Sequence, residues 1–125
     1  METYPELYSR LSYETAIVNF IKKDGTFRTM LCTRNLNSIS LKYGFKGREL
    51  GGHDNRCNIN NGNLAVFDLI IGEARSFNID RCSGVQFLGV ITTIEDMEHA
   101  FSVYSEYKKM CDDRLASPDL FNSIE

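Results

Sequence analysis

The chain has 125 residues, of which 42% are hydrophobic, and a formal net charge of −3; these values suit one globular domain and leave little room for a second. No apolar stretch approaches the roughly 20 residues that a membrane-spanning helix needs, and the polar N-terminus lacks the basic start and apolar core of a signal peptide. The four cysteines form no CxxC pair and are too sparse for a disulfide scaffold. We therefore expect a single cytoplasmic domain over residues 1–125, with reduced cysteines and no membrane partner.

The charge is distributed unevenly along the chain. Residues 22–57 contain eight basic and three acidic residues, whereas residues 93–125 contain eight acidic and three basic ones. This asymmetry is typical of a polyanion-binding face beside an acidic tail. It also fits a basic loop and an acidic helix surface that have no relation to each other.

The first half of the chain predicts a β-hairpin after a loosely ordered start. Residues 1–12 are polar and rich in tyrosine, and we expect them to be extended or loosely ordered. Residues 15–22 and 27–34 are rich in β-branched and aromatic side chains, which favour strands. Residues 35–44 fit either a short strand or a turn of helix.

The Asp24-Gly25 pair between the two strands predicts a two-residue type I′ turn. This turn places Phe20 opposite Thr29 and Val18 opposite Leu31. One face of the hairpin then carries Ala16, Val18, Phe20, Thr29, Leu31 and Thr33, and the other carries Ile17, Asn19, Ile21, Arg28, Met30 and Cys32. We expect the first face in the core and the second covered by the C-terminal helix or a partner.

The middle of the chain predicts a long loop and more strands. Residues 45–62 are polar and rich in glycine and asparagine, which indicates an irregular loop of the kind that often carries function. Residues 63–71 and 74–79 predict a second hairpin with a Gly-Glu turn, and residues 84–92 predict a last strand.

Five short strands over residues 13–92 indicate a mainly β fold, a small closed Sm-like or SH3-like β-barrel. A C-terminal helix follows the barrel. Residues 92–95 (TTIE) resemble a capping box, and an apolar stripe at helical spacing extends the helix over residues 93–114. The Ser-Pro pair beyond it ends the helix, so we expect residues 115–125 to form a tail.

Three segments carry recognisable motifs. Residues 28–33 read RTMLCT, residues 66–69 read VFDL and residues 75–81 read RSFNIDR. Together they resemble a family of small tailed-phage proteins described as WYL-like, with an Sm-like SH3 β-barrel fold. The last motif also resembles the R-x-F-x-x-D-R segment that closes WYL domains in bacterial regulators. The resemblance implies the same barrel fold for this chain.

The WYL resemblance also implies a basic pocket for nucleotides or nucleic acid, which carries over to Arg75, Phe77, Asp80 and Arg81. From the residues alone, Asp80 and Arg81 fit two roles. They pair or cap the turn between two strands, or Arg81 joins Arg28 and Arg75 in a guanidinium cluster for phosphate. Aromatic residues nearby, such as Phe27 and Tyr43, are suited either to stacking on bases or to filling the core. The candidate ligand-binding residues are Arg28, Arg34, Arg75, Phe77, Asp80 and Arg81, with Lys46, Arg48, His53 and Arg56 in the 45–62 loop.

The sequence contains no motif for catalysis. It has neither a GxxxxGK phosphate loop nor a GxSxG elbow. The His53 and Cys57 pair offers two metal ligands, whereas a zinc site needs about four. We therefore predict a binding module, without enzymatic activity, metal or cofactor.

Two functions fit these observations. The first is that of a small phage accessory protein, in the cytoplasm of the host cell, that binds a host protein and modulates transcription, RNA metabolism or defence. The alternative is binding of RNA, single-stranded DNA or a nucleotide through the arginine face of the barrel, although such proteins usually carry a net positive charge. The amphipathic helix and the two-sided hairpin also suit a homodimer.

Overall fold

The computed structural model describes residues 3–53 and 57–116. The helices and strands, with η marking 3-10 helices, are α1 (Tyr4–Leu11), β1 (Thr15–Ile21), β2 (Phe27–Thr33), α2 (Leu36–Tyr43), η1 (Gly44–Arg48), α3 (Glu49–His53), β3 (Asn63–Asp68), β4 (Glu73–Asn78), η3 (Ile79–Arg81), β5 (Cys82–Gly89) and α4 (Ile94–Ala116).

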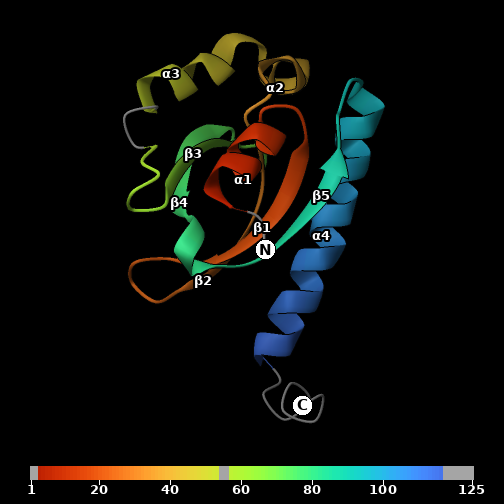
Figure 1. Ribbon diagram of the computed structural model, residues 1–125. Helices are drawn as coiled ribbons and strands as arrows, with labels where there is room; N and C mark the ends of the chain where they lie inside the picture. Colours follow the sequence, from red (N-terminus) through yellow and green to blue (C-terminus); the bar gives the residue numbers. More distant parts are fainter. Residues whose placement is uncertain (1–2, 54–56, 117–125) are drawn as a thin grey trace.

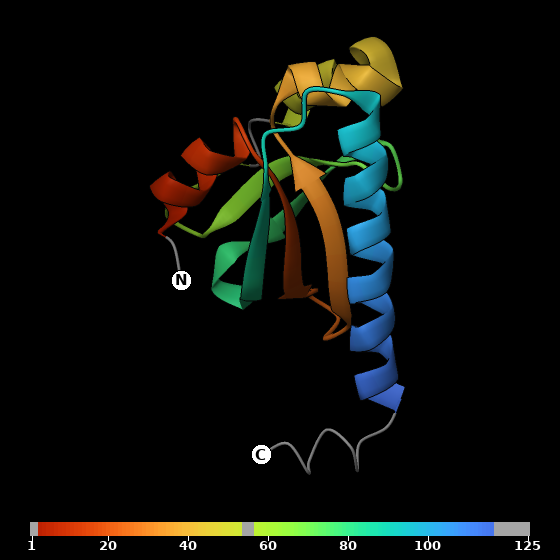
Figure 2. The same cartoon turned by 90° about the vertical axis from the view of Figure 1, so that its right-hand side faces the viewer.

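The five strands form one antiparallel sheet in the order β4-β3-β2-β1-β5 (Figure 1). The long helix α4 runs along one side of the curved sheet, and α1 lies on the other side (Figure 2). The predicted mainly β fold with a C-terminal helix is confirmed. The predicted closure is not found, because β4 and β5 lie at the two edges of the sheet. The short helix η3 connects these edges, and the sheet stays open along the seam between them.

The turn between β1 and β2 has three residues, where the sequence predicts two. The Gly25 N–H donates to the Lys22 carbonyl, and the Lys22 N–H donates to the Thr26 carbonyl, both at 2.9 Å. A type I′ turn needs two residues with positive φ, but only Gly25 of the central pair has one, at 86°. The Asp24 side chain instead accepts a hydrogen bond from the Thr26 N–H at 2.9 Å. Hydrogen bonding by Thr26, first through its side chain and then through its backbone N–H, holds the pKa of Asp24 below its ordinary value.

The longer turn shifts the hairpin by one residue from the predicted register. Val18 lies opposite Met30 rather than Leu31, and Phe20 lies opposite Arg28. Because successive side chains point to opposite faces, a slip of one residue moves all of β2 to the other face. The predicted division of faces was therefore correct for β1 and reversed for β2.

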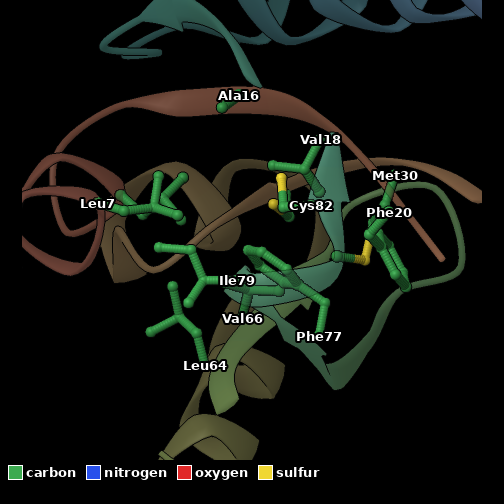
Figure 3. Packing of buried hydrophobic residues seen from close by; sticks show 12 residues of the cluster. Leu7, Ala16, Val18, Phe20, Met30, Leu64, Val66, Phe77, Ile79 and Cys82 are labelled. Atoms are coloured by element: carbon green, nitrogen blue, oxygen red, sulfur yellow. The ribbon is translucent and has the colours of Figure 1, made fainter. Parts of the chain in front are cut away.

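The sheet separates two hydrophobic cores. One core lies between the sheet and α1 (Figure 3) and consists of Leu7, Leu11, Ala16, Val18, Phe20, Met30, Cys32, Leu64, Val66, Phe77, Ile79 and Cys82. The other lies against α4, α2 and α3 and consists of Ile17, Leu31, Ile39, Leu50, Phe67, Leu69, Ala74, Ile91, Met97, Ala100 and Tyr104. The C-terminal helix thus covers the second sheet face. The sequence analysis left two possible covers open, this helix or a partner. The helix and the sheet face therefore bury each other within the chain.

The N-terminal segment is a helix, which corrects the prediction of a loosely ordered start. Thr3 and Glu6 form a reciprocal capping box, with the Glu6 N–H 3.4 Å from Thr3 Oγ1 and the Thr3 N–H 3.3 Å from Glu6 Oε2. Pro5 stands in the first turn, where its missing N–H costs nothing. Leu7 and Leu11 share one helix face, and both side chains are fully buried. The helix therefore belongs to the first core.

The predicted 45–62 loop is in large part helical. Residues 44–48 form η1 and residues 49–53 form α3, and residues 54–56 lie outside the described residues. Within these helices, Leu50 is buried in the second core. Gly47 lies so close to α2 that an added Cβ would be 3.0 Å from a methyl carbon of Ile39. The segment is thus packed against the sheet as a second, smaller layer.

The helix α4 begins one residue later than the predicted cap implies. The Asp96 N–H donates to Thr93 Oγ1 at 3.1 Å, so Thr93 caps the helix in place of Thr92. Further along, the Tyr104 hydroxyl donates to the Thr29 carbonyl at 3.2 Å, and Asn19 Nδ2 donates to the Tyr107 hydroxyl. These bonds fix α4 against the β1–β2 hairpin. The predicted tail, except for its first two residues, lies outside the described residues.

Replacing Leu7 by alanine should lower the free energy of unfolding by about 2–5 kcal/mol, because it opens a cavity in the first core. Chemical denaturation followed by circular dichroism measures the change. The control is Ser9→Ala on the exposed face of the same helix, which should change stability by less than about 0.5 kcal/mol. Equal stability of the two variants would show that α1 is not part of the core.

Candidate ligand-binding groove

A groove opens between the tip of the β1–β2 hairpin and the edge strand β4. It consists of two adjoining cavities of about 510 and 390 Å³, which share Phe20, Lys22 and Ser76. Phe20 lies near the end of β1, Lys22 begins the turn, and Ser76 lies in β4. The groove therefore lies between the end of the hairpin and β4, and no residue of β5 is among its described lining residues.

Buried aromatic residues form the floor of the groove. The ring centroids of Phe20 and Phe77 are 5.5 Å apart, and the two residues are only 6% and 3% exposed. Met30 lies beside Phe20 in the same core (Figure 3). Phe77, a predicted ligand contact, thus packs mainly against its neighbours and offers little ring surface for stacking on a base.

The walls of the groove are basic. Lys22, Lys23 and Arg81 line the first cavity, and Lys22, Arg28 and Arg75 line the second. Among the described residues that line the two cavities, one carboxylate, that of Glu73, opposes these five cations. The structure thus brings together the three arginines that the sequence analysis grouped as a face, and it adds two lysines to them.

Arg75 is partly neutralised by acidic neighbours. Its Nε lies 4.0 Å from Asp68 Oδ2, and its Nη2 lies 3.8 Å from Glu73 Oε2. Asp68 is nearly buried, and its other oxygen accepts hydrogen bonds from the N–H groups of Ile70 and Ile71 at 2.9 and 3.0 Å. Asp68 therefore ends β3 and shapes the turn to β4, so Arg75 has a structural partner as well as a place in the groove.

Asp80 and Arg81 do not form the ion pair that was one of the two readings of their motif. Both are exposed in η3, and no ion pair or hydrogen bond joins their side chains. The turn is capped instead by Asn78, whose Oδ1 accepts a hydrogen bond from the Asp80 N–H at 2.9 Å. Arg81 has no carboxylate partner among the described residues, which leaves its guanidinium available to a ligand in the first cavity.

Arg34 lies apart from the groove and has a structural role. Its guanidinium donates to the Ala65 carbonyl and to the Tyr8 hydroxyl, the latter at 3.1 Å, and lies over the Tyr8 ring at 4.4 Å. Its Nη1 is also 3.7 Å from Cys57 Sγ. These contacts join α1, β2 and β3, so Arg34 holds the N-terminal helix in place.

Tyr4 provides a second link between α1 and β3. Its hydroxyl donates to the Asn63 carbonyl at 2.7 Å. Burial, with the Cys57 thiol as a secondary contributor, raises the pKa of Tyr4 to about 12. Burial likewise raises the pKa of the Cys32 and Cys82 thiols, so both remain protonated at neutral pH.

The loop candidates lie on a different part of the surface. Lys46 and Arg48 are exposed in η1, with the Arg48 guanidinium 4.6 Å from the Phe45 ring centroid. His53 ends α3, and Arg56 lies outside the described residues. Neither Lys46 nor Arg48 lines the groove, so the structure does not join them to the arginine face.

The sequence analysis missed Lys22 and Lys23 as site residues. Both were counted in the basic segment, but Lys22 was taken as the end of the first strand and Lys23 as part of the hairpin turn. It also considered Tyr43 as a stacking residue, whereas the Tyr43 ring packs on Phe67 at 5.3 Å and its hydroxyl donates to the Leu69 carbonyl. The available signal for the lysines was their position at a turn that follows a core strand.

The mainly β fold of the structure agrees with the family that the sequence matches. A sequence model of the WYL_2 family, described as having an Sm-like SH3 β-barrel fold, matches residues 4–82, which is more than half of the chain. The chain belongs to this family. The match runs from α1 to the first residue of β5 and leaves α4 outside. No curated protein and no solved structure gives a significant match.

Two features are absent from residues 3–53 and 57–116. In these ranges no three His, Cys, Asp or Glu side chains gather as they would around a metal ion. None of the helices described is sufficiently long and apolar to cross a membrane.

Replacing Arg34 by alanine should lower the free energy of unfolding by about 2–3 kcal/mol, because it removes charge-assisted hydrogen bonds at a partly buried site. Arg81→Ala, which removes an exposed and unpaired guanidinium, should change it by less than about 0.5 kcal/mol. Urea denaturation of both variants provides the comparison. A large loss of stability in Arg81→Ala would assign that arginine to the fold and remove it from the groove.

Proposed function

We propose that this protein is a non-enzymatic binding module that takes a phosphate-bearing ligand, either single-stranded nucleic acid or a nucleotide, in the groove between the β1–β2 hairpin and β4. The main support is the collection of five cations from three separate segments around one hollow. Glu73 is the one carboxylate among the described lining residues, and Asp24 and Asp68 lie 4.0 Å from Lys22 and Arg75 outside the lining. Guanidinium groups bind phosphate oxygens through paired N–H donors, and lysines add unspecific attraction.

The composition of the lining supports the same ligand class. Asn61, Asn63 and Asn78 line the first cavity beside the cations. Amide groups both donate and accept hydrogen bonds, as the polar edges of bases do. Acidic side chains lie close to one part of the groove, because Lys22 and Arg28 also line a neighbouring cavity with Asp68 and Asp112. The first cavity has Lys22, Lys23 and Arg81 and no carboxylate among its described lining residues, so the positive field that supports the proposal is strongest there.

Binding of a labelled single-stranded RNA or DNA octanucleotide, followed by fluorescence anisotropy, should weaken linearly in a plot of log affinity against log salt. Arg28→Ala and Arg81→Ala should each reduce the slope by about one, because each removes one phosphate contact. Lys109→Ala, which removes an exposed cation of α4 outside the groove, should leave the slope unchanged. Absence of binding at the lowest salt, or equal effects of all three variants, would contradict the proposal.

Binding of a host protein is a second candidate function, favoured by an exposed patch on α2 and η1. Leu36 is 53% exposed and Phe45 is 77% exposed, and Lys46 and Arg48 lie in the same short segment as Phe45. Large apolar side chains bordered by charges are typical of protein interaction surfaces. The sequence analysis considered the second hairpin face and the C-terminal helix as interaction surfaces, but these pack against each other. The patch of Leu36 and Phe45 is therefore the candidate surface proposed here in their place.

If a protein partner binds this patch, Leu36→Asp combined with Phe45→Asp should abolish its recovery in affinity purification from the lysate of a host cell. Arg28→Ala combined with Arg81→Ala should retain it, because these residues lie in the groove. Both double variants change exposed or half-exposed positions and should keep the circular dichroism spectrum of the parent chain. Recovery that is the same with both variants would exclude the patch as the binding surface.

A further inference from the structure

A third cavity adjoins the groove on the side of α4. Its volume of about 380 Å³ lies within the range of about 300–1,000 Å³ that small-molecule sites occupy. It shares Lys22 and Arg28 with the second cavity of the groove, and the rest of its lining comes from the hairpin, the turn after β3 and α4. A ligand with a phosphate at Arg28 therefore has room to extend into this third cavity.

Most polar groups that line the third cavity are already paired within the chain. Thr29 Oγ1 donates to Asn19 Oδ1 at 2.9 Å, and the Tyr104 hydroxyl donates to the Thr29 carbonyl at 3.2 Å. Lys108 Nζ and Asp112 Oδ2 form an ion pair at 2.7 Å. The groups that these contacts leave over are the ones available to a ligand.

Two groups of opposite charge in this lining keep free bonding capacity. Arg28 forms neither a hydrogen bond nor an ion pair with another described residue. Asp68 is only 3% exposed, and its Oδ1 accepts from the N–H groups of Ile70 and Ile71. Its Oδ2 accepts no hydrogen bond from the described residues, and its ion-pair partner, Arg75 Nε, is 4.0 Å away. A buried acceptor in this state gains from a ligand that donates an N–H.

The charges of the third cavity determine which part of a ligand suits it. Its described lining holds three cations and two carboxylates, while Phe27, Ile70 and Ile71 add apolar surface. The excess of positive charge disfavours an ammonium group, and the Asp68 carboxylate disfavours a phosphate beside it. A neutral N–H donor joined to an anion at Arg28 meets both conditions. A nucleotide has this combination, with the donor on its base and the charge on its phosphate.

Guanine is the common base whose hydrogen-bonding edge best matches a carboxylate. Its N1–H and its N2 amino group are neighbouring donors with no acceptor between them. Adenine and cytosine place their amino group beside an accepting ring nitrogen, and uracil has its N3–H between two carbonyls. Because an ionised carboxylate only accepts hydrogen bonds, these neighbouring acceptors are repelled by it.

We infer that the third cavity is a base-recognition pocket that selects guanine through the Asp68 carboxylate, while the phosphate of the same nucleotide lies at Arg28 and Lys22. This inference rests on the proposed function and specifies which base the ligand carries next to the groove.

Fluorescence anisotropy with five labelled RNA octamers tests the inference. Each octamer consists of uridine except at one central position, which holds uridine, guanosine, inosine, adenosine or cytidine. The guanosine octamer should bind at least about tenfold more tightly than the all-uridine octamer, as one added charge-assisted hydrogen bond provides. The inosine octamer, which lacks the N2 amino group, should lie between them.

A substitution at Asp68 tests the residue itself. Asp68→Asn keeps Oδ1 as the acceptor for Ile70 and Ile71 and replaces Oδ2 by an amide that donates. It should lower the affinity for the guanosine octamer to that for the all-uridine octamer. The matched control is Asp80→Asn, which changes an exposed carboxylate that lines none of the three cavities and should keep the guanosine preference. Circular dichroism and thermal unfolding verify that both variants fold.

Equal affinity of the parent chain for all five octamers would overturn the inference and leave the proposed function in place, because only phosphates would then be recognised. A guanosine preference that persists in folded Asp68→Asn would also overturn it, since the base would bind elsewhere. If Asp68→Asn does not fold, the comparison of guanosine with inosine on the parent chain decides. If no octamer binds at the lowest salt, the proposed function fails together with the inference.

Discussion

The register of the β1–β2 hairpin determines which residues each of the two cores receives. The three-residue turn that ends at Gly25 places Val18, Phe20, Met30 and Cys32 on one face, where they meet α1, and turns Ile17 and Leu31 toward α4. With a two-residue turn the side chains of β2 would be exchanged between the faces. The same turn places Lys22 at the groove and Arg28 directly opposite Phe20, so the site and the cores depend on one local geometry.

A sheet with two apolar faces needs two covers, and this chain supplies them from its opposite ends. The first is α1. Its Tyr4 donates to the Asn63 carbonyl, and its Tyr8 accepts a hydrogen bond from Arg34, which also donates to the Ala65 carbonyl. The second is α4, which buries Met97, Ala100 and Tyr104. The family match includes α1 and ends before α4. The matched segment alone would therefore leave the face around Ile17 and Leu31 without its largest cover.

The sequence predicted those features that depend on local pattern, namely the strands, the long C-terminal helix and the fold class with its family. The sequence did not predict the correct structure where the same residues fit two similar local conformations. Asp-Gly fits both a type I′ turn and a three-residue turn with a glycine bulge, and only tertiary packing selects between them. The capping box of Thr3 and Glu6 and the i, i+4 spacing of Leu7 and Leu11 were readable signals of α1, but the polar composition of the segment concealed them. Of the site, the arginines were predictable from their motifs. The lysines were not, because whether a turn residue borders a groove depends on how β4 curls.

Arginines that are close in the sequence have different surroundings in this fold. Arg34 and Arg28 are only six residues apart, yet the first holds α1 on the sheet and the second lines an open cavity. The difference follows from position along β2: Arg28 lies near the hairpin tip, where the sheet is open, and Arg34 follows the other end, where α1 crosses. A guanidinium that already donates to carbonyl and hydroxyl oxygens has fewer N–H groups to offer a phosphate. Arg81, which has no such partner among the described residues, is for this reason the arginine whose chemistry is least committed to the fold.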